Sequence, residues 1–305
     1  MSGAFAVVPG AYAGGLRYVD VVSEAVSGRL FLHGAQVTSW RPAGVDDSLI
    51  WLSEEAVFRE GTAIRGGIPI CFPWFGPDKP PAGGPSHGLA RLVNWRMLEA
   101  TGLDDGAVSV SVGIDSSEPA PDPGWAHAFR VRDGESGAVG FSARLTAVFG
   151  ASLDTRLEVT NTGARAIGFE AALHSYYRVA DVTRVHISGL EGAPFVERAS
   201  GATQESRVEQ EPIRFAGEVD RIYEDAPSRV TLVDEVTGGS LLLESVGAGS
   251  WVVWNPHITK AAAMADFGDD EWRTMVCVEP AALHGGTVWL EPGECHTLGV
   301  AVRRS

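Results

Sequence analysis

Short segments in which polar and apolar residues alternate constrain the fold of this chain more than any other feature of its sequence. Segments 16–22 and 153–159 alternate most clearly, and turns rich in Gly, Pro, Asn and Asp separate such segments along the chain. Alternation is typical of strands, whose successive side chains point to opposite faces of a sheet. Because no long stretch has helical periodicity, the sequence predicts an all-β fold, a large antiparallel β-sandwich or barrel.

Strands are predicted over most of the chain, with one short helix in segment 53–61 and a polar connection at 189–210. The remaining predicted strands are 29–33, 33–40, 49–52, 94–99, 107–114, 129–132, 139–149, 166–177, 219–223, 229–233, 240–244, 251–254, 274–278, 287–290 and 297–303. The helix is expected because Ser53 can cap it and two glutamates follow in its first turn. No linker-like tract divides the chain, so residues 1–305 are expected to form a single domain.

Charge and composition limit the partners that the chain can have. With 24 Lys and Arg against 39 Asp and Glu, the formal net charge is -15, which repels nucleic acid and anionic membranes. No apolar run is long enough to span a bilayer, and a cytoplasmic location without nucleic-acid or membrane partners is expected. The three cysteines, Cys71, Cys277 and Cys295, are expected to be reduced. No two histidines have ligand-pair spacing, so no metal site is expected.

A stretch rich in glycine, proline and large aromatic residues carries two arginines and a histidine. It comprises residues 63–77 and 86–91, with Arg65, His87 and Arg91. Glycine lets a ligand approach the backbone, and a guanidinium offers a planar fork of donors that fits phosphate or carboxylate. The stretch is therefore interpreted either as the wall of a pocket for an anionic small molecule or as a tight loop whose arginines pair with acidic residues.

Three polar residues stand out in otherwise apolar strands. His174 lies in the predicted strand 166–177, where a histidine with both nitrogens satisfied in the core is the simpler interpretation. Glu279 follows the apolar segment 274–278, and the proline after it is expected to end the strand, so Glu279 is either a solvated strand end or a functional carboxylate. Asp220, taken alone, is a weaker indication of a functional site. Asn255 fits an ordinary Asn-Pro turn.

Seven short motifs, in this order along the chain, resemble those of the hexose-6-phosphate mutarotases, the glucose-6-phosphate 1-epimerases of the aldose 1-epimerase superfamily. The motifs are RGGIP (65–69), FPWFGP (72–77), HGLAR (87–91), LHSY (173–176), VDRIY (219–223), WNP (254–256) and VCVE (276–279). The resemblance implies one large galactose mutarotase-like sandwich with its site on the concave face. It also implies that His174 and Glu279 meet across that face.

The chemistry that the resemblance implies is the interconversion of the α and β anomers of a phosphorylated hexose. Glu279 as general base would remove the proton of the anomeric hydroxyl, and His174 as general acid would protonate the ring oxygen. The ring would open to the aldehyde and close again on either carbonyl face. This reaction needs no metal and no redox cofactor. A monomer is expected.

The resemblance also assigns the substrate-binding residues. Arg65 and Arg91 would bind the phosphate, Asp220 would accept a hydrogen bond from a sugar hydroxyl, and His87 would bond the sugar near C1. Ser86 stands where some family members are expected to carry glutamine, which leaves the preferred hexose open. Two alternatives remain: a non-catalytic carbohydrate-binding or regulatory sandwich, and a mutarotase for unphosphorylated hexoses.

Overall fold

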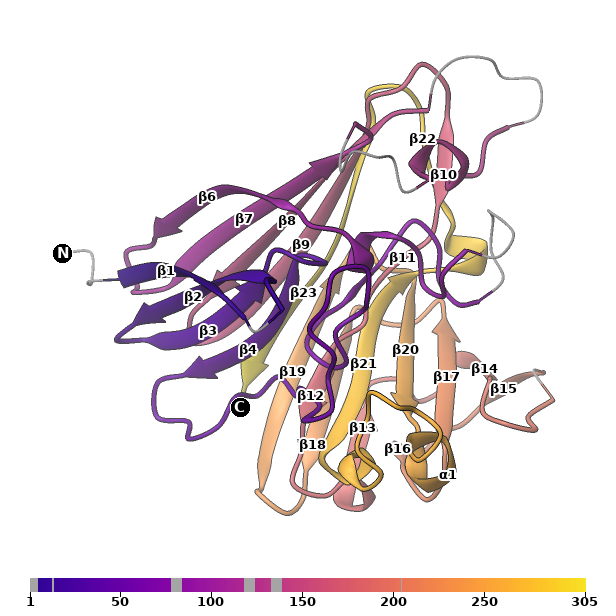
Figure 1. Ribbon diagram of the computed structural model, residues 1–305. Helices are drawn as coiled ribbons and strands as arrows, with labels where there is room; N and C mark the ends of the chain where they lie inside the picture. Colours follow the sequence, from indigo (N-terminus) through magenta and orange to yellow (C-terminus); the bar gives the residue numbers. More distant parts are fainter. Residues whose placement is uncertain (1–4, 13, 78–83, 118–123, 133–138, 204) are drawn as a thin grey trace.

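Two large antiparallel sheets form most of the computed structural model, which describes residues 5–12, 14–77, 84–117, 124–132, 139–203 and 205–305 (Figure 1). The first has eight strands: β15 (Ser206–Val208), β14 (Pro194–Glu197), β17 (Val219–Glu224), β20 (Ser250–Asn255), β21 (Met275–Ala282), β11 (Ala171–Leu173) and β5 (Ile70–Cys71) in spatial order, with β12 (Tyr176–Arg178) also paired to β21. The second has nine: β16 (Ile213–Arg214), β13 (Val185–Ser188), β18 (Arg229–Asp234), β19 (Gly239–Val246), β23 (Cys295–Arg304), β9 (Ser152–Asn161), β8 (Phe141–Phe149), β7 (Val108–Asp115) and β6 (Arg96–Gly102).

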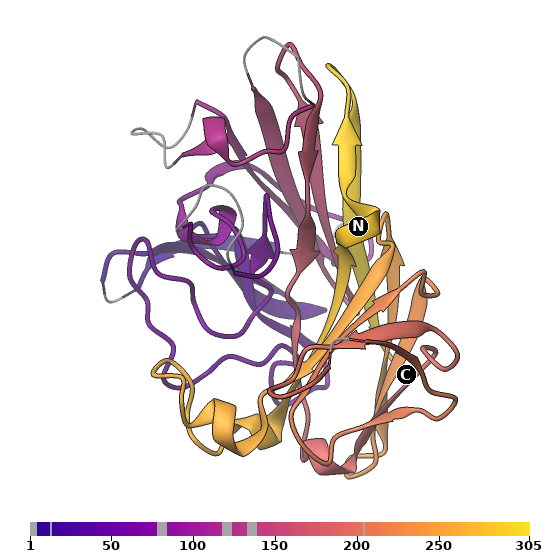
Figure 2. The ribbon, with the colours of Figure 1, turned by 90° about the vertical axis from the view of Figure 1, so that its right-hand side faces the viewer.

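Two smaller sheets and a few short helices complete the described part of the chain. The sheets are β1 (Phe5–Ala11), β2 (Arg17–Ser23), β3 (Val26–Phe31) and β4 (Gln36–Pro42), and the pair β10 (Ile167–Phe169) and β22 (Val288–Leu290). The helices are η1 (Ala90–Leu92), η2 (Trp125–His127), η3 (Val182–Arg184), α1 (His257–Ala261), η4 (Glu271–Thr274) and η5 (His284–Gly286). Figure 2 shows the N-terminal strands and the loops after them on one side of the molecule, and the strands after residue 219 on the other. None of the helices in the described ranges is long and apolar enough to cross a membrane.

The main hydrophobic core follows from the alternation of the long strands. In β8 and β9 every second residue is buried, so one face of each strand packs inward. All eight residues of β21 are buried, which shows that this strand is covered on both faces. Val276 and Val278 belong to the main core, whereas Ala281 belongs to a separate, smaller cluster.

This smaller cluster lies on one face of the eight-stranded sheet, and we call it the apolar floor. Its members are Cys71, Phe75, Ala172, Ile222, Val252, Ala281 and Leu283. Ala281 and Glu279 are two positions apart on β21, so their side chains share a face. The apolar floor therefore forms the hydrophobic surroundings of Glu279.

Most predicted strands are confirmed, and the exceptions have physical reasons. Segment 53–61 forms turns rather than a helix. The Ser53 hydroxyl does accept a hydrogen bond from the N–H of Glu55 at 3.1 Å. It also donates to the Glu271 carboxylate at 2.6 Å, and the N–H of Glu54 donates to that carboxylate at 2.7 Å. These contacts with a distant residue satisfy donors that a helix start would leave free.

Other corrections concern strand limits. Segments 49–52 and 129–132 form no strands beyond isolated bridges. These bridges join Ile50 to Tyr177 and Leu52 to Gly66 in the first segment, and Arg130 to Gly168 in the second. Segment 166–177 is broken into β10, β11 and β12 rather than being continuous. Strands β1, β5, β13 and β16 lie outside the predicted set. Strands β14 and β15 lie within the predicted polar connection, of which residue 204 is outside the described part.

Candidate active site

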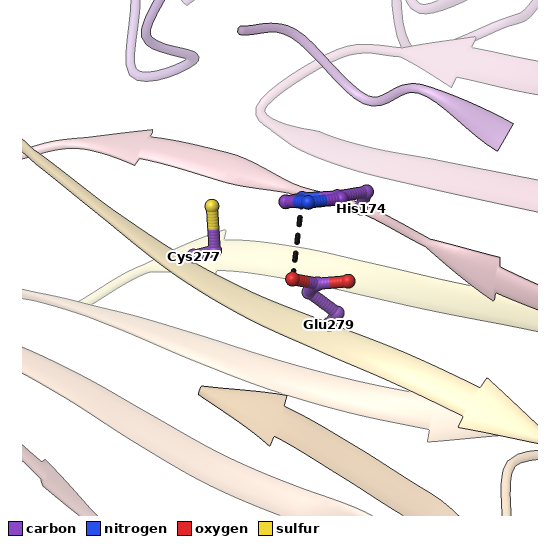
Figure 3. A group of neighbouring side chains, drawn as sticks. All are labelled: His174, Cys277 and Glu279. Carbon is purple, nitrogen blue, oxygen red and sulfur yellow. Dashed lines mark ion pairs between the residues drawn. The ribbon is translucent and has the colours of Figure 1, made fainter. Parts of the chain in front are cut away.

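A histidine between two strands and a glutamate within a third meet on the floor side of the eight-stranded sheet. Nδ1 of His174 lies 3.1 Å from Oε1 of Glu279 (Figure 3). His174 lies in the interruption between β11 and β12, where its N–H donates to the carbonyl of Pro69 at 2.9 Å. Since β11 and β12 both pair with β21, this interruption is held directly beside Glu279.

Glu279 is an interior residue of its strand, which corrects the prediction that the strand ends there. Strand β21 continues through Pro280 to Ala282, and Glu279 is only 1% exposed. The sheet tolerates the missing proline donor because the next residue is bonded again, with the N–H of Gly249 donating to the carbonyl of Ala281. A solvated strand end is therefore excluded for Glu279.

Burial drives both members of this pair toward their neutral forms. It raises the pKa of Glu279 well above its usual value, and the Asp220 carboxylate raises it further. Burial lowers the pKa of His174 well below its usual value, and His87 and Arg91 lower it further. In Figure 3 the carboxylate lies beneath the imidazole ring. Within the described residues neither Nδ1 nor either Glu279 oxygen has a hydrogen-bond partner. The pair has unused hydrogen-bonding capacity that a substrate can take up.

Aromatic neighbours fix the orientation of the His174 ring. The ring stacks on Tyr176 at a centroid distance of 4.8 Å and an interplanar angle of 7°. Trp254 contacts it edge-on at 5.9 Å, and His87 does so at 5.7 Å. With three rings around it, the His174 imidazole is held in one orientation on the floor side.

His87 is a neutral hydrogen-bond donor. Its Nδ1 accepts from the N–H of Gly76 at 3.3 Å, so in the neutral ring the proton is on Nε2. Burial, followed by the charge of Arg91, lowers the pKa of His87 to about 3. Its backbone is in the left-handed region (φ 62°), as is that of Gly88, where a Cβ would lie 2.1 Å from the carbonyl oxygen of Phe72. Only glycine fits that second position.

The two predicted phosphate-binding arginines differ in their contacts. Arg65 forms a two-bond ion pair with Asp266, through Nε at 3.2 Å and Nη2 at 3.1 Å, and Nη1 donates to the Tyr176 hydroxyl at 3.1 Å. Arg91 donates to the carbonyl of Ser86 at 2.7 Å, while its buried Nε has no partner in the described part of the chain. Each arginine's charge lies close enough to act on the other, since Arg65 lowers the pKa of Arg91. Among the described residues, the acid-paired interpretation therefore holds for Arg65 and not for Arg91.

Asp220 lies on the same sheet, at the far side of Trp254. In register, Asp220 pairs with Trp254 and Trp254 pairs with Cys277. Its Oδ2 is 3.5 Å from Nζ of Lys260, a residue that the sequence analysis missed. Burial nonetheless raises the pKa of Asp220. The chain thus brings Asp220, His87, Arg91, Arg65, His174 and Glu279 to one region of the molecule.

The turn predicted at Asn255 is present. The Asn255 side chain donates to the carbonyls of Trp272 and Met275 and accepts from the N–H of His257, all within 2.9 Å. The residue is structural and closes β20.

One group of side chains has the donor types of a metal site. Ligand atoms of His174, Cys277 and Glu279 lie within 4.8 Å of one another, although no sequence spacing indicated this. Burial, followed by the Glu279 carboxylate, raises the pKa of the Cys277 thiol, which favours the neutral thiol over the thiolate that binds zinc. The positive charge of Arg65 lowers that pKa in part, but it also repels a cation from the group. We therefore assign no metal to this group.

Cavity size alone would not identify this site. Cavities of about 390 Å³ and 630 Å³ lie elsewhere on the molecule, and none of the six site residues named above lines either of them. The chemistry of the grouped side chains distinguishes the site instead.

Comparison with known proteins agrees with the architecture. The fold is galactose mutarotase-like: a galactose mutarotase-like protein from Lactobacillus casei superposes with a TM-score of 0.68 at 15% identity, over 94% of this chain and all of that one. Residues 23–303 match the aldose 1-epimerase family, and the chain belongs to that family. It is an isomerase of the epimerase and mutarotase class.

Individual relatives show which members of the family this chain resembles. A protein of Cenchrus ciliaris is 35% identical over 272 residues, 87% of this chain and 77% of its own length. One of Salmonella typhimurium is 33% identical over 264 residues, 87% of this chain and 82% of its own. Both are named "Putative glucose-6-phosphate 1-epimerase". The crystal structure of YeaD from Salmonella typhimurium superposes with a TM-score of 0.82 at 26% identity, over 98% and 93% of the two chains. The resemblance to this family that the motifs indicated is thereby confirmed.

Proposed function

We propose that this protein interconverts the α and β anomers of glucose 6-phosphate or a closely related hexose 6-phosphate. The observation that carries the proposal is the buried contact of 3.1 Å between His174 and Glu279, whose facing atoms have no hydrogen-bond partner in the described residues. Ring opening of a pyranose requires one group to accept the anomeric hydroxyl proton while another donates a proton to the ring oxygen. These two side chains provide such a pair.

In the proposed reaction Glu279 takes the proton of the anomeric hydroxyl as His174 delivers one to the ring oxygen. The C1–O5 bond breaks and an aldehyde forms. Rotation about C1–C2 presents the other carbonyl face, and reversed proton transfers close the ring. Glu279 ends the opening step as a carboxylic acid and His174 as a neutral imidazole, which are the forms that burial favours.

The pair holds the same number of protons before and after ring opening. Either distribution of that one proton can therefore start a cycle, with the carboxylic acid donating and the imidazole accepting in the alternative direction. Two coupled groups of this kind titrate as a unit. The reaction consumes no proton and needs no group outside the pair to reset it.

The other site residues are proposed to bind the substrate. His87 offers Nε2–H as a donor for a sugar oxygen, and Asp220 offers a carboxylate that accepts from a hydroxyl. Arg91 has an unused buried N–H for the phosphate. Arg65 retains two N–H groups that neither Asp266 nor Tyr176 uses. Because the half-buried Arg91 has no acidic partner among the described residues, its guanidinium favours a phosphosugar over a neutral sugar. The intact acid/base pair favours catalysis over binding alone.

Two-dimensional exchange NMR of glucose 6-phosphate tests the proposal. The protein is expected to increase the exchange cross-peaks between the α and β anomeric protons far above those of spontaneous mutarotation. Glucose under the same conditions serves as the comparison and is expected to be accelerated much less. An exchange rate that stays at the spontaneous value for every hexose 6-phosphate tried would refute the enzymatic proposal.

A further inference from the structure

We propose that Arg198 is a third substrate-binding arginine, which contacts the phosphate of the sugar together with Arg91. The identity of the ligand rests on the proposed function, whereas the placement of Arg198 rests on the sheet register and its contacts. No motif in the sequence indicated this residue.

The need for a further cation follows from the charge balance of the site. A sugar phosphate carries a charge of about -1.5 to -2 at neutral pH. Arg65 is already neutralised by its two-bond ion pair with Asp266. Arg91 alone would then face a dianion in a chain whose formal net charge is -15. A second guanidinium without an acidic partner would complete the charge balance.

The register of β14 against β17 places Arg198 on the floor side of the sheet. Glu197 pairs with Arg221, and both lie on the face where Phe195 packs against Tyr223 at 5.0 Å. The N–H of Arg198 donates to the carbonyl of Asp220 at 2.6 Å and so extends the ladder by one residue. Alternation then puts the Arg198 side chain on the opposite face, which is the face of Asp220.

The Arg198 side chain is half-buried. Among the described residues it makes no hydrogen bond and no ion pair, whereas Arg221 is tied to Glu197 and Glu209 at 2.8 Å each. Its positive charge nevertheless acts on two site residues, because it lowers the pKa of both His87 and Asp220. These two residues come from different segments, so the Arg198 guanidinium lies within electrostatic reach of both.

A competing role would be to stabilise the Asp220 carboxylate without contacting phosphate. The two roles differ in what they predict for a sugar that has no phosphate. Loss of a phosphate contact weakens the binding of the phosphosugar only, whereas loss of support for Asp220 weakens the binding of both sugars alike.

Binding measurements on the intact chain distinguish these roles. Dissociation constants for glucose 6-phosphate by calorimetry and for glucose by NMR titration are compared among wild type, Arg198→Ala, Arg198→Gln and Arg207→Ala. Arg207 is an exposed arginine of β15 that donates to Thr203, and it serves as the matched control. Arg198→Ala and Arg198→Gln are expected to weaken glucose 6-phosphate binding by about 10-fold or more, as for one lost charge-assisted contact. Glucose binding should stay within about twofold.

Two results would overturn the inference: unchanged glucose 6-phosphate affinity in folded Arg198 variants, or an equal loss for both sugars. Unchanged thermal unfolding of either variant shows that it is folded, and the glutamine variant serves if the alanine variant is not. Because these are binding constants, they stand apart from catalysis. A wild-type protein that binds the phosphosugar through Arg198 but does not accelerate anomer exchange would refute the proposed function and leave the inference in place.

Discussion

Replacing Arg91 by alanine should separate binding of the phosphate from catalysis at C1. The variant loses a half-buried guanidinium whose buried Nε has no partner within the described residues and whose Nη2 donates to the carbonyl of Ser86 at 2.7 Å. Hydrogen bonds to charged groups each contribute about 1.5–3 kcal/mol. At 1.4 kcal/mol per tenfold, one such bond corresponds to a rise of about 10–100-fold in KM for glucose 6-phosphate.

The maximal rate should change much less than KM. The phosphate is remote from the reacting carbon, so its contact contributes mainly to binding that substrate and transition state share. Arg91→Lys keeps the charge but loses the planar fork, and it should lie between wild type and alanine. Line-shape or exchange NMR over a range of sugar concentrations gives both parameters.

Arg156→Ala is the matched control for this experiment. Arg156 is exposed, pairs with Asp154 on the other large sheet, and should leave both parameters unchanged. A KM for glucose 6-phosphate that stays at the wild-type value in folded Arg91→Ala would refute the phosphate assignment. So would a loss of the same size for glucose, since glucose has no phosphate to lose.

Three further predictions follow from the pair and its surroundings. Glu279→Gln and His174→Asn should each lower the protein-dependent exchange rate by about 10²-fold or more with thermal unfolding near that of wild type, and full activity in either would exclude that residue. The exchange rate should be nearly constant over a broad range of pH. It should decrease at pH values below the lowered pKa of His174, where the pair gains a second proton, and at pH values above the raised pKa of Glu279, where the pair loses its only proton. A decrease centred at the usual pKa of a glutamate would contradict this prediction. Gly88→Ala should destabilise the fold by about 2 kcal/mol or more because its Cβ would meet a backbone carbonyl at positive φ, whereas Gly249→Ala, with open space, should change the melting temperature little.

The sequence predicted the strands well where side chains alternate, since alternation reports one buried face. Strand 153–159 is an example, and it lies within β9. The short helix after Ser53 could not be excluded from local residues, because the carboxylate that replaces it comes from Glu271, far along the chain. Glu279 was misplaced at a strand end because a proline usually ends pairing, and here the ladder resumes after it.

The sequence predicted which residues form the site better than it predicted the contacts between them. Motifs indicated His174, Glu279, Arg65 and Arg91, and the structure brings the first two to 3.1 Å. The partner of Arg65 lies 201 residues away and carries no local pattern, so its ion pair could not be foreseen. Arg198 sits in a predicted polar connection, and only the register with β17 places it at the site. The single-domain organisation and the roles of the site residues remain predictions.

The ion pair between Arg65 and Asp266 bears on how quickly the proposed reaction can release its product. Both anomers carry the same phosphate, so every contact to that group holds substrate and product equally. A site with all its guanidiniums free would lengthen the residence time of each without favouring the transition state. Because Asp266 accepts hydrogen bonds from two N–H groups of Arg65, it limits the affinity of the site for the phosphate. A carboxylate that never touches the sugar would then set the upper limit on turnover.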